Sequence, residues 1–279
     1  MKETLKYTVP TVLSIAGFDG SGGAGIQADT KTISSLGCYA MNVLTALPVQ
    51  NTQGVKNIFD IPVEAVEEQL ICLFEDIYPD CIKIGMVHNT KLVETICTQL
   101  KGYTGQIIFD PVMVSTSGHR LINEDTIEAI KSLLFPLASI ITPNLDEVSV
   151  LVGKEIHDLN AMEEVSGQII AMGCKAALLK GGHLKADILT SLLIQQNKPT
   201  QYFESKRINT QNTHGSGCTL SSAIASFIAR GFPLEAATEK ALAYVNLAID
   251  GSKDLVLGKG HGPLNHFFNP LKLIKNEMD

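Results

Sequence analysis

Asn212-Thr-His-Gly-Ser-Gly-Cys-Thr-Leu-Ser-Ser-Ala223 joins a glycine-rich turn to a helical segment, and the rest of the sequence can be interpreted around it. Gly215 and Gly217 leave the backbone free to turn tightly. We expect a helix over residues 219–230, so unpaired amide groups and the positive end of its dipole would face one point and could hold an anion. Cys218 lies at that point, and a thiol at a helix N-terminus has its thiolate favoured. A purely structural alternative, an ordinary turn before a buried helix, stays open at this stage.

The composition is typical of a globular enzyme with a sizeable core. The chain has 279 residues, of which 45% are hydrophobic. The net charge of −7 is spread along the chain without a basic run, which argues against nucleic acid or an anionic membrane as the main partner. No apolar run reaches the roughly 18 residues of a membrane span, and the N-terminus carries no recognisable presequence. We therefore expect a cytoplasmic protein.

The cysteines and histidines do not indicate a metal site or a disulfide framework. The six cysteines lie at irregular spacings inside apolar segments, without a CxxC pair, and are expected to be reduced thiols. The seven histidines form no HExxH or similar cluster, so a protein-held transition metal is not expected.

Short apolar runs alternate with helical segments along the chain. Strands are expected at 11–16, 39–49, 55–61, 81–86, 106–109, 139–142 and 176–180, and helices at 26–36, 63–76, 90–100, 124–135, 159–172, 219–230 and 234–250. Segments 187–194 and 201–207 are expected to form a small antiparallel hairpin. This order predicts an α/β fold of three layers, with a mostly parallel central sheet and helices on both faces, as one domain over residues 1–279.

In such a fold the loops at the carboxyl ends of the strands meet at one edge, where ligands bind. Polar or glycine-rich segments fall at those ends, at 17–25, 50–51, 85–86, 110–118, 142–147, 180–183 and 212–218. Turn chemistry alone hardly explains so many polar strand ends. We therefore expect one binding site there.

Two nucleotide-binding motifs can be set aside. Gly20, Gly22 and Gly25 fit GxGxxG between a strand and a helix, but no acidic residue occurs between Asp29 and Asp60, where a dinucleotide site needs one for the ribose. The chain also lacks GxxxxGK[ST], which excludes a P-loop.

The remaining strand-end residues suit phosphate chemistry. Lys180 ends a buried strand before two glycines, where a lysine has little structural purpose. Asn144 and Glu147 could be a helix cap and a first-turn acid, or could hold Mg²⁺ through its waters. Asp110 is either a turn residue or a polar site residue. Met86 is either a core residue or a flat apolar wall against a ring.

Several segments, in order, resemble the hydroxymethylpyrimidine/phosphomethylpyrimidine kinases, a thiamine-biosynthesis branch of the ribokinase superfamily. The resemblance runs from Thr11 to Phe267. It rests on segment 17–25, Gln27-Ala-Asp-Thr-Lys31, Thr45-Ala-Leu-Pro-Val-Gln-Asn-Thr-Gln-Gly54, Lys83-Ile-Gly-Met86, Asp110-Pro-Val-Met113, Thr142-Pro-Asn-Leu-Asp-Glu147, Lys180-Gly-Gly-His183, segment 212–219 and Gly260-His-Gly-Pro-Leu-Asn-His266.

The resemblance implies a reaction and the partners for it. Members of the family use ATP and Mg²⁺ to phosphorylate the hydroxymethyl group of 4-amino-5-hydroxymethyl-2-methylpyrimidine, and then phosphorylate that monophosphate to the diphosphate. They commonly form homodimers.

The resemblance also implies roles for individual residues. Gln50 would bind the aminopyrimidine edge, because an amide both donates and accepts hydrogen bonds. The implied assignments are Gln50, Asp19, Gly17 and Met86 for the substrate, Asn144, Glu147 and Asp110 for the metal, Thr213, Lys180 and Asn144 for the nucleotide, and Cys218, Gly215, Gly217 and Lys180 for catalysis.

Cys218 stands where many sugar kinases of the superfamily have an aspartate base. A thiolate is a weak base toward a primary alcohol, but phosphoryl transfer depends mostly on alignment and charge neutralisation. We therefore expect Cys218 to orient the hydroxymethyl group and to accept its proton late.

The sequence departs from the family pattern at three places. Ser115-Thr116-Ser117-Gly118 replaces the usual Ala-Lys-Ser-Gly, which removes one cationic contact to the phosphates. Phe18 and Pro48 differ from the residues expected beside the pyrimidine.

The sequence leaves alternatives to this function. A vitamin B6 kinase is the main alternative, because pyridoxal also carries a hydroxymethyl group on a flat nitrogen ring. A sugar kinase is disfavoured by Cys218 and Gln50. A non-catalytic pyrimidine sensor is disfavoured by the retained Lys180, Asn144 and Glu147, and an interaction protein by polar residues gathered at strand ends.

Overall fold

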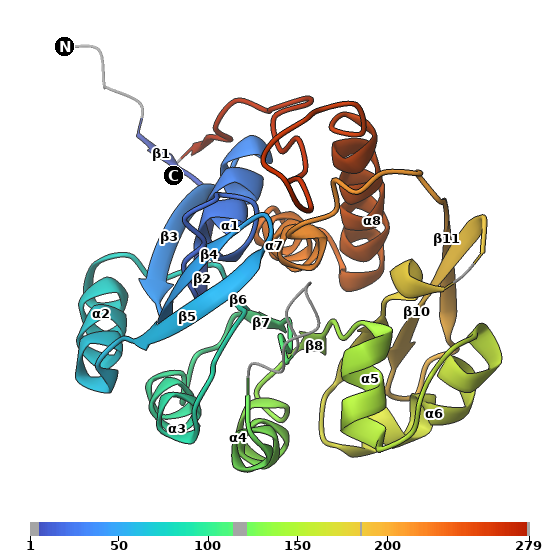
Figure 1. Ribbon diagram of the computed structural model, residues 1–279. Coiled ribbons are helices and arrows are strands. Elements are labelled where there is room, and N and C mark those ends of the chain that lie inside the picture. Colours follow the sequence, from blue (N-terminus) through green and yellow to red (C-terminus); the bar gives the residue numbers. More distant parts are fainter. Residues whose placement is uncertain (1–5, 114–121, 185, 278–279) are drawn as a thin grey trace.

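A mostly parallel sheet of eight strands forms the centre of the computed structural model, which describes residues 6–113, 122–184 and 186–277 (Figure 1). The strand order is β11-β10-β9-β8-β7-β6-β2-β3. The strands are β2 (Thr11–Ala16), β3 (Tyr39–Leu44), β6 (Cys81–Ile84), β7 (Gln106–Phe109), β8 (Ile140–Ile141), β9 (Ala176–Leu179), β10 (Ile188–Gln195) and β11 (Gln201–Lys206). All pairs from β3 to β9 are parallel.

Helices cover both faces of this sheet, which confirms the predicted three-layer fold (Figure 1). One layer contains α2 (Val63–Asp76), α3 (Thr90–Gln99), α4 (Glu124–Ala129), α5 (Leu145–Val152) and α6 (Leu159–Ala171). The other contains α1 (Gly25–Ser35), α7 (Ser216–Ala229) and α8 (Leu234–Asp250). The helix predicted over 124–135 is α4 followed by a π-helical segment, Ile130–Leu134.

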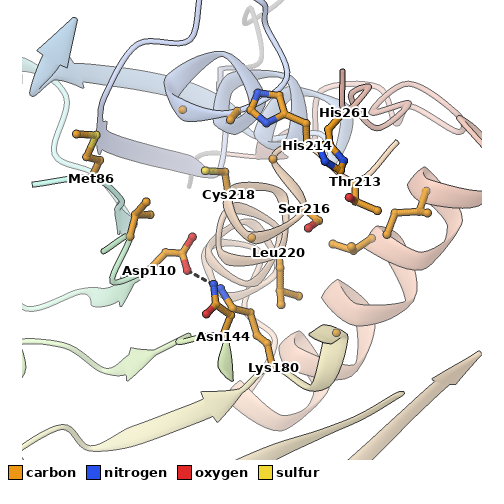
Figure 2. A pocket seen from close by; sticks show the side chains of 18 of the residues that line it. Met86, Asp110, Asn144, Lys180, Thr213, His214, Ser216, Cys218, Leu220 and His261 are labelled. Carbon is orange, nitrogen blue, oxygen red and sulfur yellow. Dashed lines mark hydrogen bonds and ion pairs between the residues drawn. The ribbon is translucent and has the colours of Figure 1, made fainter. Parts of the chain in front are cut away.

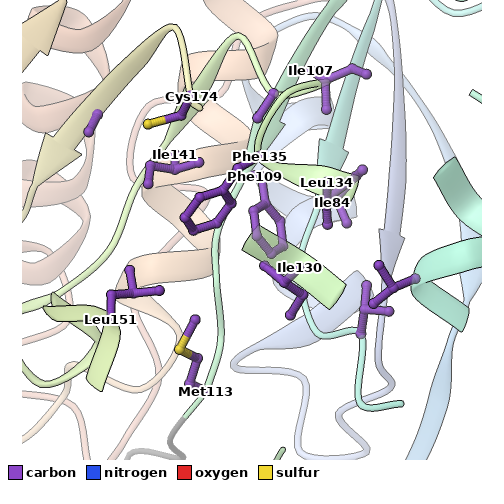
Figure 3. Packing of buried hydrophobic residues seen from close by; sticks show 14 of the residues in the cluster. Ile84, Ile107, Phe109, Met113, Ile130, Leu134, Phe135, Ile141, Leu151 and Cys174 are labelled. Atoms are coloured by element: carbon purple, nitrogen blue, oxygen red, sulfur yellow. The ribbon is translucent and has the colours of Figure 1, made fainter. Parts of the chain in front are cut away.

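Two apolar cores lie between the layers, one on each face of the sheet. Alternation along β2 divides its side chains between them, because Leu13 and Ile15 pack in the first core and Val12 in the second. Figure 3 shows part of the first core, where the rings of Phe109 and Phe135 lie 6.1 Å apart. Burial of these apolar runs on both faces makes the sheet the rigid base for the loops at its carboxyl edge.

The strand predicted over 39–49 is two strands in different sheets. β3 ends at Leu44, and β4 (Ala46–Asn51) leaves the central sheet to pair antiparallel with β5 (Gly54–Asp60). Thr45 fixes the bend, because its hydroxyl donates to the carbonyl of Met86 at 2.6 Å. The sequence shows one continuous extended run and does not reveal this change of sheet.

The structure confirms the antiparallel hairpin predicted late in the chain and shows where it lies. β10 and β11 are antiparallel to each other, but β10 also pairs antiparallel with β9, so the hairpin is the edge of the central sheet. A further small sheet pairs β1 (Tyr7–Thr8) with β12 (Asn276–Glu277).

Within the described ranges, no helix is long and apolar enough to cross a bilayer.

Candidate active site

The loops at the carboxyl edge of the sheet surround one cavity of about 600 Å³ (Figure 2). It extends from the β4–β5 hairpin, across the ends of β6 and β7, to α8. Predicted site residues that line it are Gly17, Gln50, Met86, Asp110, Asn144, Glu147, Lys180, Thr213, Gly215, Gly217 and Cys218. The expectation that polar strand ends form one site is consistent with this arrangement.

The N-terminus of α7 points its free amide groups into the cavity region. α7 begins at Ser216, earlier than the predicted start at residue 219, so Gly217 and Cys218 lie in its first turn. The Ser216 amide donates to the carbonyl of Thr213 at 3.1 Å. In the described ranges, no protein group accepts a hydrogen bond from the amides of Gly217 and Cys218. These two amides are therefore available to an anion.

Gly215 is needed for the way the two glycine loops meet. Its φ is +82°, a left-handed conformation that side chains disfavour. A Cβ at this position would lie 1.8 Å from the carbonyl oxygen of Gly23. The loop before α7 therefore packs directly on the loop before α1.

Lys180, Asp110 and Glu147 form a charged cluster beside the first turn of α7. The Lys180 ammonium lies 2.8 Å from Asp110 Oδ1 and 3.9 Å from Glu147 Oε2. A Cβ on Gly217 would come within 3.2 Å of Lys180 Nζ, so the helix backbone approaches the cation closely. One cation and two free amides thus converge on the same part of the cavity.

Asn144 and Glu147 form a complete capping box at the start of α5. Asn144 Oδ1 accepts from the Glu147 amide at 2.9 Å, and Glu147 Oε2 accepts from the Asn144 amide at 2.7 Å. Asn144 and Glu147 therefore do act as a helix cap and a first-turn acid, and both residues also line the cavity. Burial, together with the nearby Asp110 carboxylate, raises the pKa of Glu147 to about 7 against the opposing effect of Lys180.

This cluster fits a hydrated divalent cation better than a dehydrated one. The described part of the chain contains no group of three or more His, Cys, Asp or Glu side chains able to enclose a metal ion. It does place two carboxylates, Asp110 and Glu147, against one ammonium, Lys180. Burial and the Asp110 carboxylate raise the pKa of Glu147, so a bound cation would stabilise its charged form. Mg²⁺, which retains several waters, suits such a donor set.

Cys218 is a protonated thiol, which corrects the expectation of a favoured thiolate. Burial raises its pKa to about 11, and the nearby Lys83 ammonium only partly offsets this. The effect of the helix N-terminus is thus outweighed by desolvation. The sulfur still reaches the cavity wall, and the Gly25 amide donates a hydrogen bond to it.

Asp19 lies beneath the glycine loop and not in the cavity wall, which corrects its predicted contact with substrate. The residue is fully buried, and its oxygens accept hydrogen bonds from the amides of Ser21, Gly23 and Ala24. His214 Nε2 lies 2.8 Å from Asp19 Oδ2. Burial alone would raise the pKa of Asp19, but the bonds from His214 and Ser21 hold it well below its usual value. Asp19 therefore shapes the loop and joins it to the loop before α7.

The sequence interpretation missed a buried ion pair at the base of the cavity, whose lining includes Lys83. Lys83 Nζ lies 2.9 and 2.8 Å from the two carboxylate oxygens of Asp29, and both side chains are fully buried. The hydroxyls of Ser14 and Ser222 donate to the same carboxylate at 2.6 and 2.7 Å. A lysine inside the apolar run of β6 was the signal that could have revealed it.

The apolar end of the cavity was missed as well. Leu242, Val245 and Ile249 of α8, together with Leu220 of α7, form its wall near the end of β11. Their helical spacing places the α8 residues on one face, but the sequence alone did not distinguish a cavity wall from a core face.

Two departures from the family pattern, Phe18 and Pro48, line the cavity. The third, Thr116 in the 115–118 segment, lies outside the described residues.

Comparisons with known proteins agree with this geometry. A family model described as phosphomethylpyrimidine kinase matches residues 19–265. The hydroxymethylpyrimidine/phosphomethylpyrimidine kinase of Rhizobium meliloti is 42% identical over 91% of this chain and 96% of its own length. The thiamine biosynthesis bifunctional protein ThiED of Geobacter sulfurreducens is 42% identical over 92% of this chain, which spans only 52% of that longer protein.

Among solved structures, an ADP complex of Bacillus subtilis pyridoxal kinase is 32% identical, with a TM-score of 0.85, and the match covers 93% of this chain and 98% of that one.

Proposed function

The chain belongs to the phosphomethylpyrimidine kinase family, and from this premise we propose how its cavity carries out the reaction. The protein transfers a phosphoryl group from ATP to the hydroxymethyl group of 4-amino-5-hydroxymethyl-2-methylpyrimidine, and then to the monophosphate, in thiamine biosynthesis. The observation that supports our assignment of the reacting region is the pair of free amides at Gly217 and Cys218 beside Lys180. Such donors stabilise charge on a phosphoryl group in transfer.

The acceptor ring binds at the hairpin end of the cavity. Gln50 lies on β4 and donates through Nε2 to the carbonyl of Phe18 at 3.4 Å, which leaves its Oε1 available to accept from an amino group. Met86 and Gly17 are nearby apolar surfaces, with the Met86 sulfur 3.4 Å from a Cβ placed on Gly17. This arrangement suits a flat ring that carries an amino group at one edge.

The nucleotide binds from the opposite end, so its terminal phosphate meets the acceptor at α7. Leu242, Val245 and Ile249 supply an apolar wall suited to a base. Thr213 and Lys180 then lie on the way to the amides of Gly217 and Cys218. A triphosphate along this path would be neutralised by the ammonium and the helix N-terminus.

Asp110, Asn144 and Glu147 would hold Mg²⁺ through its waters, with Lys180 beside them. When bound, Mg²⁺ supplies the positive charge that neutralises the phosphate oxygens. Asp110 also accepts from the Thr142 hydroxyl at 3.0 Å, which fixes the carboxylate toward the cluster. The capping box orients Glu147 in the same way.

Cys218 orients the acceptor hydroxyl. Because the thiol is protonated at neutral pH, its sulfur accepts a hydrogen bond from the hydroxyl but does not remove the proton before attack. The proton leaves late, after the new oxygen–phosphorus bond has made the hydroxyl strongly acidic. Because a protonated thiol cannot accept it, contrary to the expectation from the sequence, the proton goes to an oxygen of the transferred phosphoryl group. Cys218→Ala is expected to lower kcat by about 10- to 100-fold, because the acceptor hydroxyl loses its alignment. A near-wild-type kcat would show that this role is wrong.

Phosphorylation of pyridoxal is the second candidate activity, because of the likeness to a pyridoxal kinase at 32% identity. A coupled ADP-release assay with the pyrimidine alcohol, its monophosphate and pyridoxal tests both activities. We expect turnover of the first two acceptors and slower turnover of pyridoxal. Efficient turnover of pyridoxal with none of the monophosphate would reverse the choice.

We further propose one kinase domain over residues 1–279, acting as a homodimer in the cytoplasm on small molecules and not on nucleic acid. The net charge of −7 supports the exclusion of nucleic acid, and the six free cysteines support a reducing compartment. Light scattering on the purified protein tests the dimer, and a monomer mass at assay concentration would contradict it.

A further inference from the structure

The tip of the β4–β5 hairpin is held by a loop from the far end of the chain. The amides of Lys259 and Gly260 each donate to Thr52 Oγ1 at 3.2 Å. The amide of His261 donates to the Thr52 carbonyl at 3.0 Å. Thr52, in the turn between β4 and β5, therefore accepts three hydrogen bonds from consecutive residues of a loop that follows α8.

The glycines of this loop, Gly-Lys-Gly-His-Gly over residues 258–262, are shaped to the threonine. A Cβ on Gly258 would lie 2.3 Å from Thr52 Oγ1, and one on Gly260 would lie 1.9 Å from the Thr52 carbonyl oxygen. Gly258 also has a φ of +77°, which disfavours side chains. The contact is thus a close backbone fit and not a chance approach of two exposed loops.

The same loop is fixed on its other side to the segment that leads into α7. The His214 amide donates to the carbonyl of Gly262 at 3.0 Å. A Cβ on Gly262 would lie 1.9 Å from Asn212 Oδ1, so these two segments also touch closely. One short loop therefore connects the hairpin tip with the residues directly before the free amides.

We propose that Thr52 and the 258–262 loop form a latch that holds the hairpin over the cavity and so sets the position of Gln50. Thr52 is then a positioning residue for the acceptor ring, because it lies in the turn of the hairpin, two residues after Gln50 of β4. This inference rests on the proposed function, in which Gln50 contacts the pyrimidine. Thr52, Gln53 and His261 all line the cavity, so release of the hairpin would widen the access of water to it.

Thr52→Val removes the hydroxyl acceptor and keeps the branched shape, and Thr52→Ser is the matched control that keeps the hydroxyl. We expect Thr52→Val to raise KM for the pyrimidine alcohol about tenfold, from the loss of two hydrogen bonds, and to leave KM for ATP within about twofold. ATP hydrolysis without acceptor is expected to rise, because water enters the open cavity. Thr52→Ser should restore all three values.

Amide hydrogen exchange provides a readout that needs no substrate. The Lys259 and Gly260 amides are expected to exchange faster in Thr52→Val than in the wild type and Thr52→Ser, with exchange in α8 unchanged. If Thr52→Val does not fold, Gly260→Ala is used in its place in every assay, because it breaks the latch from the loop side. Failure of the wild type to phosphorylate the pyrimidine would contradict the proposed function, whereas the exchange experiment would still test the contact.

Two results would overturn the latch. In the first, exchange at Lys259 and Gly260 is the same in all variants. In the second, exchange accelerates but KM for the pyrimidine and the hydrolysis of ATP without acceptor both stay at wild-type values.

Discussion

Two lysine–aspartate pairs lie near the carboxyl edge of the sheet, and they differ in how completely they are enclosed. Lys83 and Asp29 are both fully buried, and two serine hydroxyls complete the hydrogen bonding of the carboxylate. The Lys180 side chain is 13% exposed, and its ammonium lies near two carboxylates, those of Asp110 and Glu147. In the first pair, which we call the closed pair, one cation balances one carboxylate. In the second, the open pair, one cation faces two carboxylates, and free amides lie beside it.

The difference shows how the same residue types serve structure and chemistry in one fold. A closed pair fixes elements relative to each other, here β6, α1, β2 and α7 through Lys83, Asp29, Ser14 and Ser222. An open pair retains unbalanced charge that a ligand can neutralise. Changes at the first pair should therefore alter stability, and changes at the second should alter catalysis.

Breaking the closed pair should give the largest effect. Lys83→Met leaves the Asp29 carboxylate buried without a cation, and we expect the free energy of unfolding to fall by about 3–5 kcal/mol. The double variant Lys83→Met/Asp29→Leu removes both charges and should regain most of that loss. Chemical denaturation of the three proteins measures this. A loss below about 1 kcal/mol in the single variant would mean that the pair is not the fixed unit described here.

Removing the cation of the open pair should mainly affect catalysis. Lys180→Met is expected to lower kcat/KM for ATP by about 10²- to 10³-fold, equivalent to roughly 3–4 kcal/mol of transition-state stabilisation. Its loss of unfolding free energy should be smaller than that of Lys83→Met, because Glu147 can take up a proton. Lys175→Met, at an exposed position before β9, is the control. An unchanged kcat/KM in Lys180→Met would contradict the assignment of the open pair to catalysis.

His266 extends the comparison to a buried group without a charged partner. It is 3% exposed, and its Nε2 lies 3.0 Å from the Thr219 hydroxyl. Burial, with a smaller effect of Lys31, lowers the pKa of His266 to about 4. The unfolded chain therefore binds a proton between pH 6.5 and 4 that the folded protein does not. This stabilising contribution is complete above pH 6.5 and should fall by roughly 2 kcal/mol between pH 7 and pH 5.

The raised pKa of Glu147 gives the opposite slope in part of this range, so the difference between wild type and His266→Asn isolates the histidine. We expect the wild type to lose more stability than the variant on going from pH 7 to pH 5. A ring NMR titration midpoint near 6.5 in the folded wild type would be incompatible with a desolvated His266.

Gly217→Ala should produce the smallest effect, with opposite signs for stability and catalysis. A Cβ there would lie 3.2 Å from Lys180 Nζ and 3.3 Å from Asp110 Oδ2, so the open pair must shift. We expect KM for ATP to rise about fivefold, while the free energy of unfolding increases by up to about 1 kcal/mol from the better helix former. A fall in both stability and affinity would indicate a general disturbance of α7. Kinetics and denaturation on the same preparation distinguish the two.

The fold was largely predictable because apolar runs and helical spacing are local signals. The alternation of strands and helices from residue 11 to residue 250 was sufficient to predict a mostly parallel sheet with helices on both faces. One error came from tertiary pairing, since the change of sheet at Thr45 has no local signature. The attachment of β10 to β9 has none either and was not predicted.

The site was less predictable than the fold, because only some of its features have a local signal in the sequence. Lys180, Asp110 and Cys218 stand out because a polar residue at a strand end has few structural uses. Burial is not local, however, and burial is what makes Cys218 a protonated thiol and places Asp19 beneath its loop. Asp29, the partner of Lys83, and the two serines that donate to its carboxylate lie on three other elements, so the sequence could not reveal that this carboxylate is fully hydrogen-bonded.

The amides of Gly217 and Cys218 donate hydrogen bonds to the phosphoryl group while it is transferred, and the proposed function depends on this contact. Backbone ¹⁵N–¹H NMR with ADP, Mg²⁺, trifluoroberyllate and the pyrimidine alcohol tests this most directly. We predict that both amide protons shift downfield and exchange more slowly when the phosphoryl mimic is added to the ADP complex. Unchanged shifts at both amides, with the mimic bound elsewhere, would contradict the account.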